Sequence, residues 1–314
     1  MCGHPDRWIE PPLLACVDAF VFISGYYGIK FKISKLVRLY TLGLLCCVIT
    51  VTMPAILGLE ELPSLKEYWI TYIQRFWFLH AYALMMLLSP LVDTKKDFST
   101  MWTVLLLVFV WAGLSSVPYL GRAMPRSAGI AAYSGLTLFG VYVAARLFRK
   151  YSLEKWLDKR KAIIATVVLY LLAVRGWAQY SSPVALGLAA LMFTYGRKIK
   201  LGAIGRYIAP STFAIYLLHS NAHSFLVMRT MEDALLGWGV PMVAAYLAVG
   251  LITFIACVII DTPRRLVMMI MKKKIDAMMA KLDQVCENAV AGIEARLEYF
   301  AAKVAENGGG GYDI

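Results

Sequence analysis

Charged residues are scarce in this sequence. They make up 17% of the 314 residues, whereas hydrophobic residues make up 60% and the mean hydropathy is +0.64. A soluble domain has about 25% charged and roughly 45–50% apolar residues. A soluble fold of this size still exposes a large surface to water, so the apolar excess cannot be buried in one core. The composition disfavours a soluble enzyme and a disordered chain, and it predicts an integral membrane protein.

Cysteine is also scarce, and its pattern excludes two further classes. The six cysteines form no CxxC pair, and four of them lie in apolar runs. They are Cys2, Cys16, Cys46, Cys47, Cys257 and Cys286. This usage is typical of small buried hydrophobic side chains rather than of a disulfide framework or metal ligands. The segment 1–10 has no basic region followed by an apolar one, so we expect no cleavable signal peptide.

Long apolar segments dominate what is present. A spanning helix needs about 20 mostly apolar residues, and nine segments meet or nearly meet that length. They are 12–29, 39–58, 76–92, 100–120, 128–147, 162–180, 183–196, 209–227 and 238–260. We therefore predict an all-α fold, a polytopic transmembrane helical bundle of about nine spans.

The basic residues gather in alternate loops. Most Lys and Arg residues lie in five segments, 30–38, 95–96, 146–161, 197–206 and 264–274, and few lie in the loops between these. Basic loops face the cytoplasm, so the chain as given begins outside and has a cytoplasmic C-terminus. This topology accounts for the net charge of +12. We expect the lipid bilayer as a partner and no nucleic acid.

A polar segment follows the last predicted span. Apolar residues recur every three or four positions over 272–304, which indicates one stripe along a helix. Two interpretations stay open: an amphipathic helix on the cytoplasmic membrane face or loops, and the seam of a coiled-coil homodimer. The predicted divisions are a membrane domain, this cytoplasmic helix and a disordered Gly-rich tail, at 1–270, 271–306 and 307–314.

Several polar or aromatic side chains interrupt the predicted spans. Such groups are costly in a bilayer and indicate functional sites by default. The candidates for lining a cavity are Asp18, Ser24, Gly25, Tyr26, Trp77, His80, Tyr82, Tyr216 and His219.

Several of these candidates also have a purely structural interpretation. Ser24 and Gly25 suit close helix packing, and Trp77 suits the aromatic belt at the membrane interface. His219 and His223 have the spacing of a metal-binding pair on one helix. No Glu lies between them and no third ligand is evident, so we expect no metal there and favour a hydrogen-bonded histidine in a polar cavity.

The first basic loop contains Lys30, Lys32, Lys35 and Arg38. Topology alone would explain these charges. They would equally suit the capture of phosphates from an anionic cytosolic donor. The residues themselves do not decide between the two interpretations.

Four motifs in register resemble a known family. They are FVFISGY at 20–26, KLVRLY at 35–40, WFLHAY at 77–82 with LSP at 88–90, and STFAIYLLH at 211–219. Together, over roughly residues 1–270, they resemble the integral-membrane acyltransferases of the acyltransferase-3 type.

The resemblance implies a function. Members transfer acyl groups, usually acetyl, from cytoplasmic acyl-CoA to hydroxyls of surface and envelope glycans. It implies acyl-CoA as donor substrate, a glycan acceptor, no bound cofactor and a bacterial inner membrane location. Lys35 and Arg38 match a paired basic motif associated with the coenzyme, and we group Lys32 with them. The alternatives are a transporter or flippase of a lipid-linked glycan, and an inactive truncated fragment.

The resemblance also concerns the start of the chain. Family members have ten spans, with a catalytic histidine at the end of the first, and this sequence contains no such first helix. It begins Met-Cys-Gly-His, so His4 is expected to end that missing helix and to act as the catalytic base. A solvated terminal histidine is the alternative.

Overall fold

The computed structural model describes residues 6–93, 135–156, 158–173 and 182–289. Within these residues it consists of helices and contains no strand, which confirms the all-α prediction. Two helices are long and apolar enough to cross a membrane, α2 (Ile33–Ile56) and α14 (Met242–Ile270). A bent pair, Leu65–Arg75 and Trp77–Val92, adds a third if it forms one span. The protein is therefore a helical membrane protein, and the number of nine spans stays a prediction.

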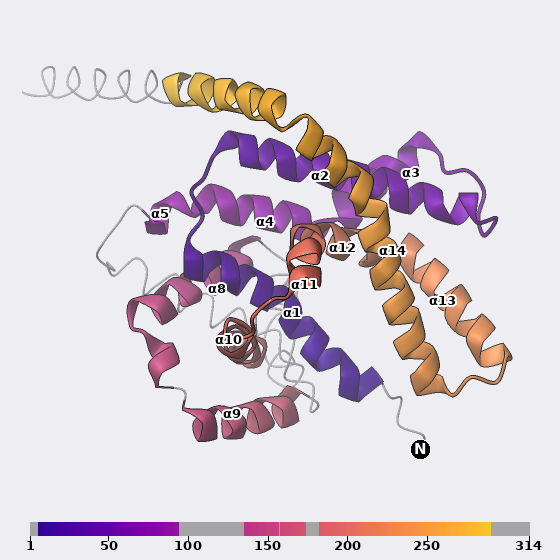
Figure 1. Cartoon of the computed structure of the whole chain (residues 1–314), viewed down its shortest axis with the longest axis horizontal. Coiled ribbons are helices and arrows are strands. Elements are labelled where there is room, and N and C mark those ends of the chain that lie inside the picture. The colour runs from indigo at the N-terminus through magenta and orange to yellow at the C-terminus, as the bar shows by residue number, and fades with distance from the viewer. Residues whose placement is uncertain (1–5, 94–134, 157, 174–181, 290–314) are drawn as a thin grey trace, which may run out of the picture.

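One group of helices surrounds α1 (Asp6–Tyr27). It packs against α8 (Gly135–Lys150) and α10 (Pro183–Gly196), and α4 (Trp77–Leu88) also packs against α8 (Figure 1). Val21, Phe22 and Tyr142 are buried where these helices meet. Apolar burial holds this group together, and α8 is buried on all sides over residues 137–143.

A second group of helices contains α2. It packs against α12 (Thr212–His219) and α13 (Ala222–Gly237), both of which also contact α14. The other described elements are α3 (Leu65–Ile70), η1 (Thr71–Arg75), α5 (Pro90–Asp93), η2 (Leu153–Lys155), α9 (Lys159–Leu172), α11 (Ala203–Ile208) and η4 (Ala209–Ser211). Of these, α9 packs against α10, and η2 packs against α8.

The predicted span 209–227 is wrong as a single helix. The helix α12 ends at His219, and α13 begins at Ala222 after a break at Ser220 and Asn221. Asn221 is the N-cap of α13, and its side-chain Oδ1 accepts a hydrogen bond from the Ser224 backbone N–H. Asparagine satisfies a free N–H at a helix start, which favours a new helix here. His219 and His223 consequently belong to different helices.

A second break lies at Phe76. The π-helix η1 ends at Arg75, α4 begins at Trp77, and the segments on either side are bent by 51°. The predicted span 76–92 thus begins at this break rather than at a membrane boundary. Span 183–196 coincides with α10, which has Ser182 as N-cap and Pro183 in its first turn. Proline is tolerated at that position because its missing N–H would lack a helical partner anyway.

The chain continues after α14. A turn at Met271 leads into a helix over 272–289, which we call the tail helix; it is yellow in Figure 1 and lies beside the start of α2. The amphipathic cytoplasmic helix expected over 271–306 stays a prediction. Several predicted features lie outside the described residues: His4, span 100–120, the beginning of 128–147, the end of 162–180, and residues 290–314.

Candidate functional site

A cavity of about 810 Å³ lies between α1, α2, α4, α12, α14 and the tail helix. Its volume is in the range of about 300–1,000 Å³ that is typical of ligand sites. Lys35 and Arg38 from the first turns of α2 line it, together with Arg264 near the end of α14. Phe20 and Tyr82 contribute to its wall. The cavity is thus mainly apolar, with cations from two helix ends.

Carboxylates pair with several cations at these two helix ends. The Arg38 guanidinium donates to Asp276 at 2.7 Å, and the Lys32 ammonium lies 3.7 Å from Asp283. Arg264 donates two hydrogen bonds to Asp261, at 2.6 and 2.9 Å. The structure therefore places the three predicted donor-binding residues at the same end of α2. Arg264 was not predicted, although Asp and Arg three residues apart on a helix would have indicated the pair.

The three residues of the Ser24-Gly25-Tyr26 motif make different kinds of contact. The Ser24 hydroxyl lies 2.9 Å from the hydroxyl of Tyr82, which lines the cavity. A Cβ on Gly25 would lie 2.5 Å from the backbone oxygen of Tyr142, so glycine allows α1 and α8 to approach closely. Only Ser24 in this motif contacts the cavity wall directly, and Gly25 has the packing role that the sequence left open.

Tyr26 belongs to a separate polar network. Its hydroxyl donates to Glu154 at 3.1 Å and accepts from Arg197 at 3.0 Å. Arg149 donates to the Tyr26 backbone carbonyl at 2.9 Å, and both guanidinium groups lie over the tyrosine ring, at 5.6 and 5.9 Å from its centre. The network connects α1, α8, η2 and the C-terminal end of α10.

An aromatic cluster separates the cavity from a second, smaller pocket. It comprises Phe20, Phe78, Tyr82, Phe213 and Tyr216, whose contacting ring centres lie 4.8–6.1 Å apart. Phe20, Tyr82 and Phe213 line the large cavity, and Phe78 and Tyr216 line the pocket. The two spaces therefore share one wall.

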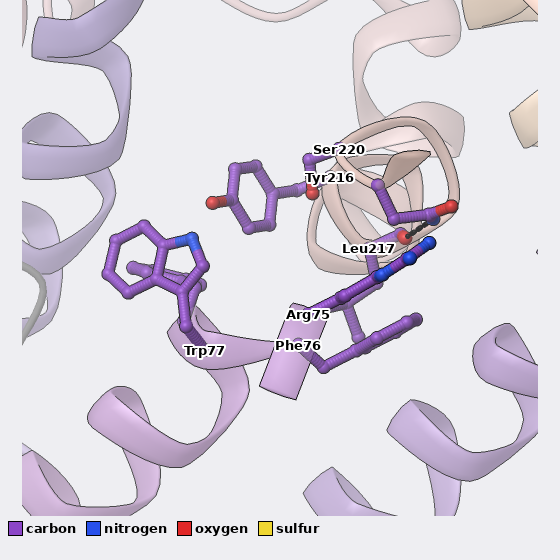
Figure 2. A pocket seen from close by; sticks show the side chains of 8 residues that line it. Arg75, Phe76, Trp77, Tyr216, Leu217 and Ser220 are labelled. Carbon is purple, nitrogen blue, oxygen red and sulfur yellow. Dashed lines mark hydrogen bonds between the residues drawn. The ribbon is translucent and has the colours of Figure 1, made fainter. Parts of the chain in front are cut away.

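The second pocket lies where the two helix breaks meet (Figure 2). Its volume of about 10 Å³ is close to the smallest space that holds one water molecule. Figure 2 shows the Trp77 and Tyr216 rings at one end of the pocket and the Arg75 side chain at the other. Ser220 and Asn221 complete the polar wall. The sequence analysis identified Trp77 and Tyr216 but missed Arg75, because its neighbourhood depends on the helix break.

The described histidines make specific contacts. His80 has Nε2 2.9 Å from the Tyr72 carbonyl and Nδ1 3.4 Å from the Tyr40 hydroxyl. His219 has Nδ1 2.6 Å from the Ile215 carbonyl of its own helix. His80 and His219 are not among the residues described as lining either pocket.

Of two further candidates from the sequence, Asp18 is not among the residues that line the cavity, and His4 lies outside the described residues. Asp18 is fully buried on α1. The role of His4 as catalytic base stays a prediction, because residues 1–5 are outside the described part of the chain.

A comparison with protein families decides the class. A family model described as an acyltransferase domain matches residues 8–262. The chain belongs to the acyltransferase-3 family. It is a membrane acyltransferase, and the match extends from α1 into α14 and ends before Arg264 and the tail helix. No curated protein and no solved structure matches the chain.

Proposed function

We propose that this acyltransferase transfers an acetyl group from acetyl-CoA, bound from the cytoplasm, to a hydroxyl of an envelope glycan. The observation that carries the proposal is the large cavity with Lys35, Arg38 and Arg264 in its wall. Lysine and arginine bind phosphate strongly through charge-assisted hydrogen bonds, and coenzyme A carries phosphates at one end. The apolar remainder of the cavity suits the uncharged pantetheine arm and the acyl group.

The small pocket supports a site for the acceptor. A hydroxyl oxygen has the size of a water molecule, for which the pocket has room. Arg75, Ser220 and Asn221 offer polar partners, and the Trp77 ring offers a flat apolar surface. The aromatic cluster stands between this pocket and the cavity, so the acceptor and the thioester would meet beside Tyr82 and Tyr216.

The proposed reaction is a direct transfer. The acceptor oxygen forms a bond to the thioester carbonyl carbon, and the carbon–sulfur bond breaks. A general base takes the hydroxyl proton and returns it to the departing thiolate of coenzyme A. His4 is the proposed base, since an ordinary imidazole, with a pKa near 6.5, is mostly neutral at physiological pH and can accept a proton. Tyr82, held by Ser24, lies at the cavity wall, where a hydroxyl can orient the carbonyl.

Transfer in membranes tests the proposal. The full-length protein in proteoliposomes would receive acetyl-CoA labelled in the acetyl group and an envelope glycan. We expect label on the glycan in an alkali-labile ester, with none when the glycan is omitted. Absence of transfer, combined with glycan flux that needs no acyl donor, would contradict the proposal and favour a transporter.

A further inference from the structure

The tail helix has two aspartates that face α2. Asp276 and Asp283 are about two helical turns apart and therefore lie on one helix face. The Asp283 carboxylate accepts the Ser34 backbone N–H at 2.9 Å and the Ser34 hydroxyl at 2.7 Å. Asp276 accepts from Arg38 at 2.7 Å. Both carboxylates thus contact the start of α2, where the predicted donor-binding residues lie.

The groups around Asp283 are those that bind a phosphate. Ser34 supplies a backbone N–H at the first turn of a 24-residue helix and a hydroxyl, and Lys32 supplies a cation 3.7 Å away. Helix starts with free N–H groups and nearby cations bind anions. Ser34 and Asp283 are buried, with 6% and 8% of their surface exposed. A carboxylate of the chain itself therefore occupies a buried anion-binding position.

The charge on Asp283 is favoured by this position. The hydrogen bond from the Ser34 backbone N–H holds the pKa of Asp283 below its usual range, with further help from the Ser34 hydroxyl and Lys32. The side chain is consequently an anion at neutral pH, as a bound phosphate would be.

The tail helix also forms part of the cavity wall. Ile275, Met278 and Met279 line the cavity together with Lys35 and Arg38. Ile275 and Met278 belong to the apolar stripe that the sequence analysis considered for a homodimer. Within one chain, these two side chains already line the proposed donor cavity.

We propose that the tail helix is an acidic strap that competes with the donor for the start of α2. The inference rests on the proposed function of the cavity as the acyl-CoA site. A coenzyme phosphate bound at the start of α2 would use the Ser34 N–H, the Ser34 hydroxyl and Lys32, which Asp283 contacts, and the carboxylate would repel it. Arg38 and Asp276 are 39% and 48% exposed, so their ion pair is weak and the strap can be displaced.

Coenzyme A binding to the full-length protein tests this competition. If the strap is docked in about nine-tenths of the molecules, a mutation that releases it should lower the apparent dissociation constant for coenzyme A about ten-fold. We expect that gain from Asp283→Ala and a smaller gain from Asp283→Asn, which keeps a hydrogen-bond acceptor for Ser34. Glu287→Ala is the matched control, because Glu287 is an exposed acid one turn further along the tail helix. Its dissociation constant should equal that of the unaltered protein.

The outcomes separate this inference from the proposed function. Unchanged or weaker coenzyme binding in both Asp283 variants, with a lower melting temperature, would show that Asp283 merely caps α2 and would overturn the strap. Absence of coenzyme binding in every variant would overturn the strap and the donor site together.

The position of the tail provides a second test. The variant Met279→Cys would be made in a protein whose native cysteines are replaced by alanine. The rate at which this single cysteine is alkylated would then measure how exposed the strap is. Saturating coenzyme A should raise that rate several-fold, because the donor displaces the strap. A rate that falls or stays the same would show that the donor binds beneath a docked helix, and it would contradict the proposal.

Discussion

The two spaces on either side of the aromatic cluster differ in size and chemistry. The cavity has about 810 Å³, an apolar wall and cations from the ends of α2 and α14. The pocket has about 10 Å³ and is lined by both polar and aromatic side chains at two helix breaks. Both spaces take side chains from α4 and α12, but the small pocket lies at the two helix breaks themselves, whereas α1, α2, α14 and the tail helix complete the cavity. The proposed transfer of an acyl group from a large donor to a single hydroxyl would use two spaces of such different size.

The largest expected effect concerns which side of the membrane each space faces. A cysteine at Leu62, which is 81% exposed between α2 and α3, should react fully with an impermeant thiol reagent on intact cells. A cysteine at Lys200 should not react until the membrane is opened. Both variants would be made in a protein whose native cysteines are replaced by alanine. The reverse pattern of labelling would place the cavity outside and exclude a cytoplasmic donor.

Charge reversal in the cavity is the next test. Lys35→Glu combined with Arg38→Glu should weaken coenzyme A binding about 100-fold, because two charged hydrogen-bonding partners become repulsive. The dissociation constant measures this directly. Lys198→Glu with Lys200→Glu makes the same charge change after α10, away from the cavity lining, and should leave the constant within two-fold. Equal losses in both double variants would indicate only a general electrostatic effect.

A change in the small pocket should affect the binding of the acceptor and not that of the donor. Trp77→Ala removes one wall of the pocket and should raise the KM for the glycan about ten-fold, as expected for losing a half-buried aromatic contact. Coenzyme A binding should not change. Trp69→Ala is the control, because Trp69 is 62% exposed on α3. A change in coenzyme affinity without a change in glycan KM would reverse the proposed assignment of the two spaces.

The smallest effect concerns the helix break itself. Asn221→Ala removes the N-cap of α13 and should lower the free energy of unfolding by about 1 kcal/mol. Asn221→Ser, which retains a capping oxygen, should lose less. Thermal unfolding followed by circular dichroism in detergent compares the two variants. Equal melting temperatures for both variants and the unaltered protein would show that the break does not depend on this cap.

Local signals predicted some helix boundaries well. The bounds predicted for the segment 183–196 coincide with those of the helix α10, since Ser182, Pro183 and Gly196 are residues that start and stop helices. That this helix spans the membrane stays a prediction. The span 39–58 was placed six residues too late because Lys35 and Arg38 were assigned to a loop, although they belong to α2. Charges near a helix end are compatible with a membrane helix, since long basic side chains reach the interface.

Features that depend on distant residues could not be predicted. The segment 209–227 hides the break at Asn221, because hydropathy averaged over the whole segment stays apolar despite the short polar stretch 219–224. The motif at 20–26 gave no indication that Ser24 and Tyr26 belong to different networks, since their partners come from α4, η2 and α10. The contacts of Asp276 and Asp283 likewise require the tail helix to return to α2.

The surroundings of Tyr26 have a consequence for mutational scanning. Arg149 and Arg197 both stand over its ring, one also bonded to its backbone carbonyl and the other to its hydroxyl. This redundancy means that either arginine can be removed while the second still holds the end of α1 in place. A scan of single substitutions would therefore score each arginine as tolerant, and only the double replacement would reveal their shared role.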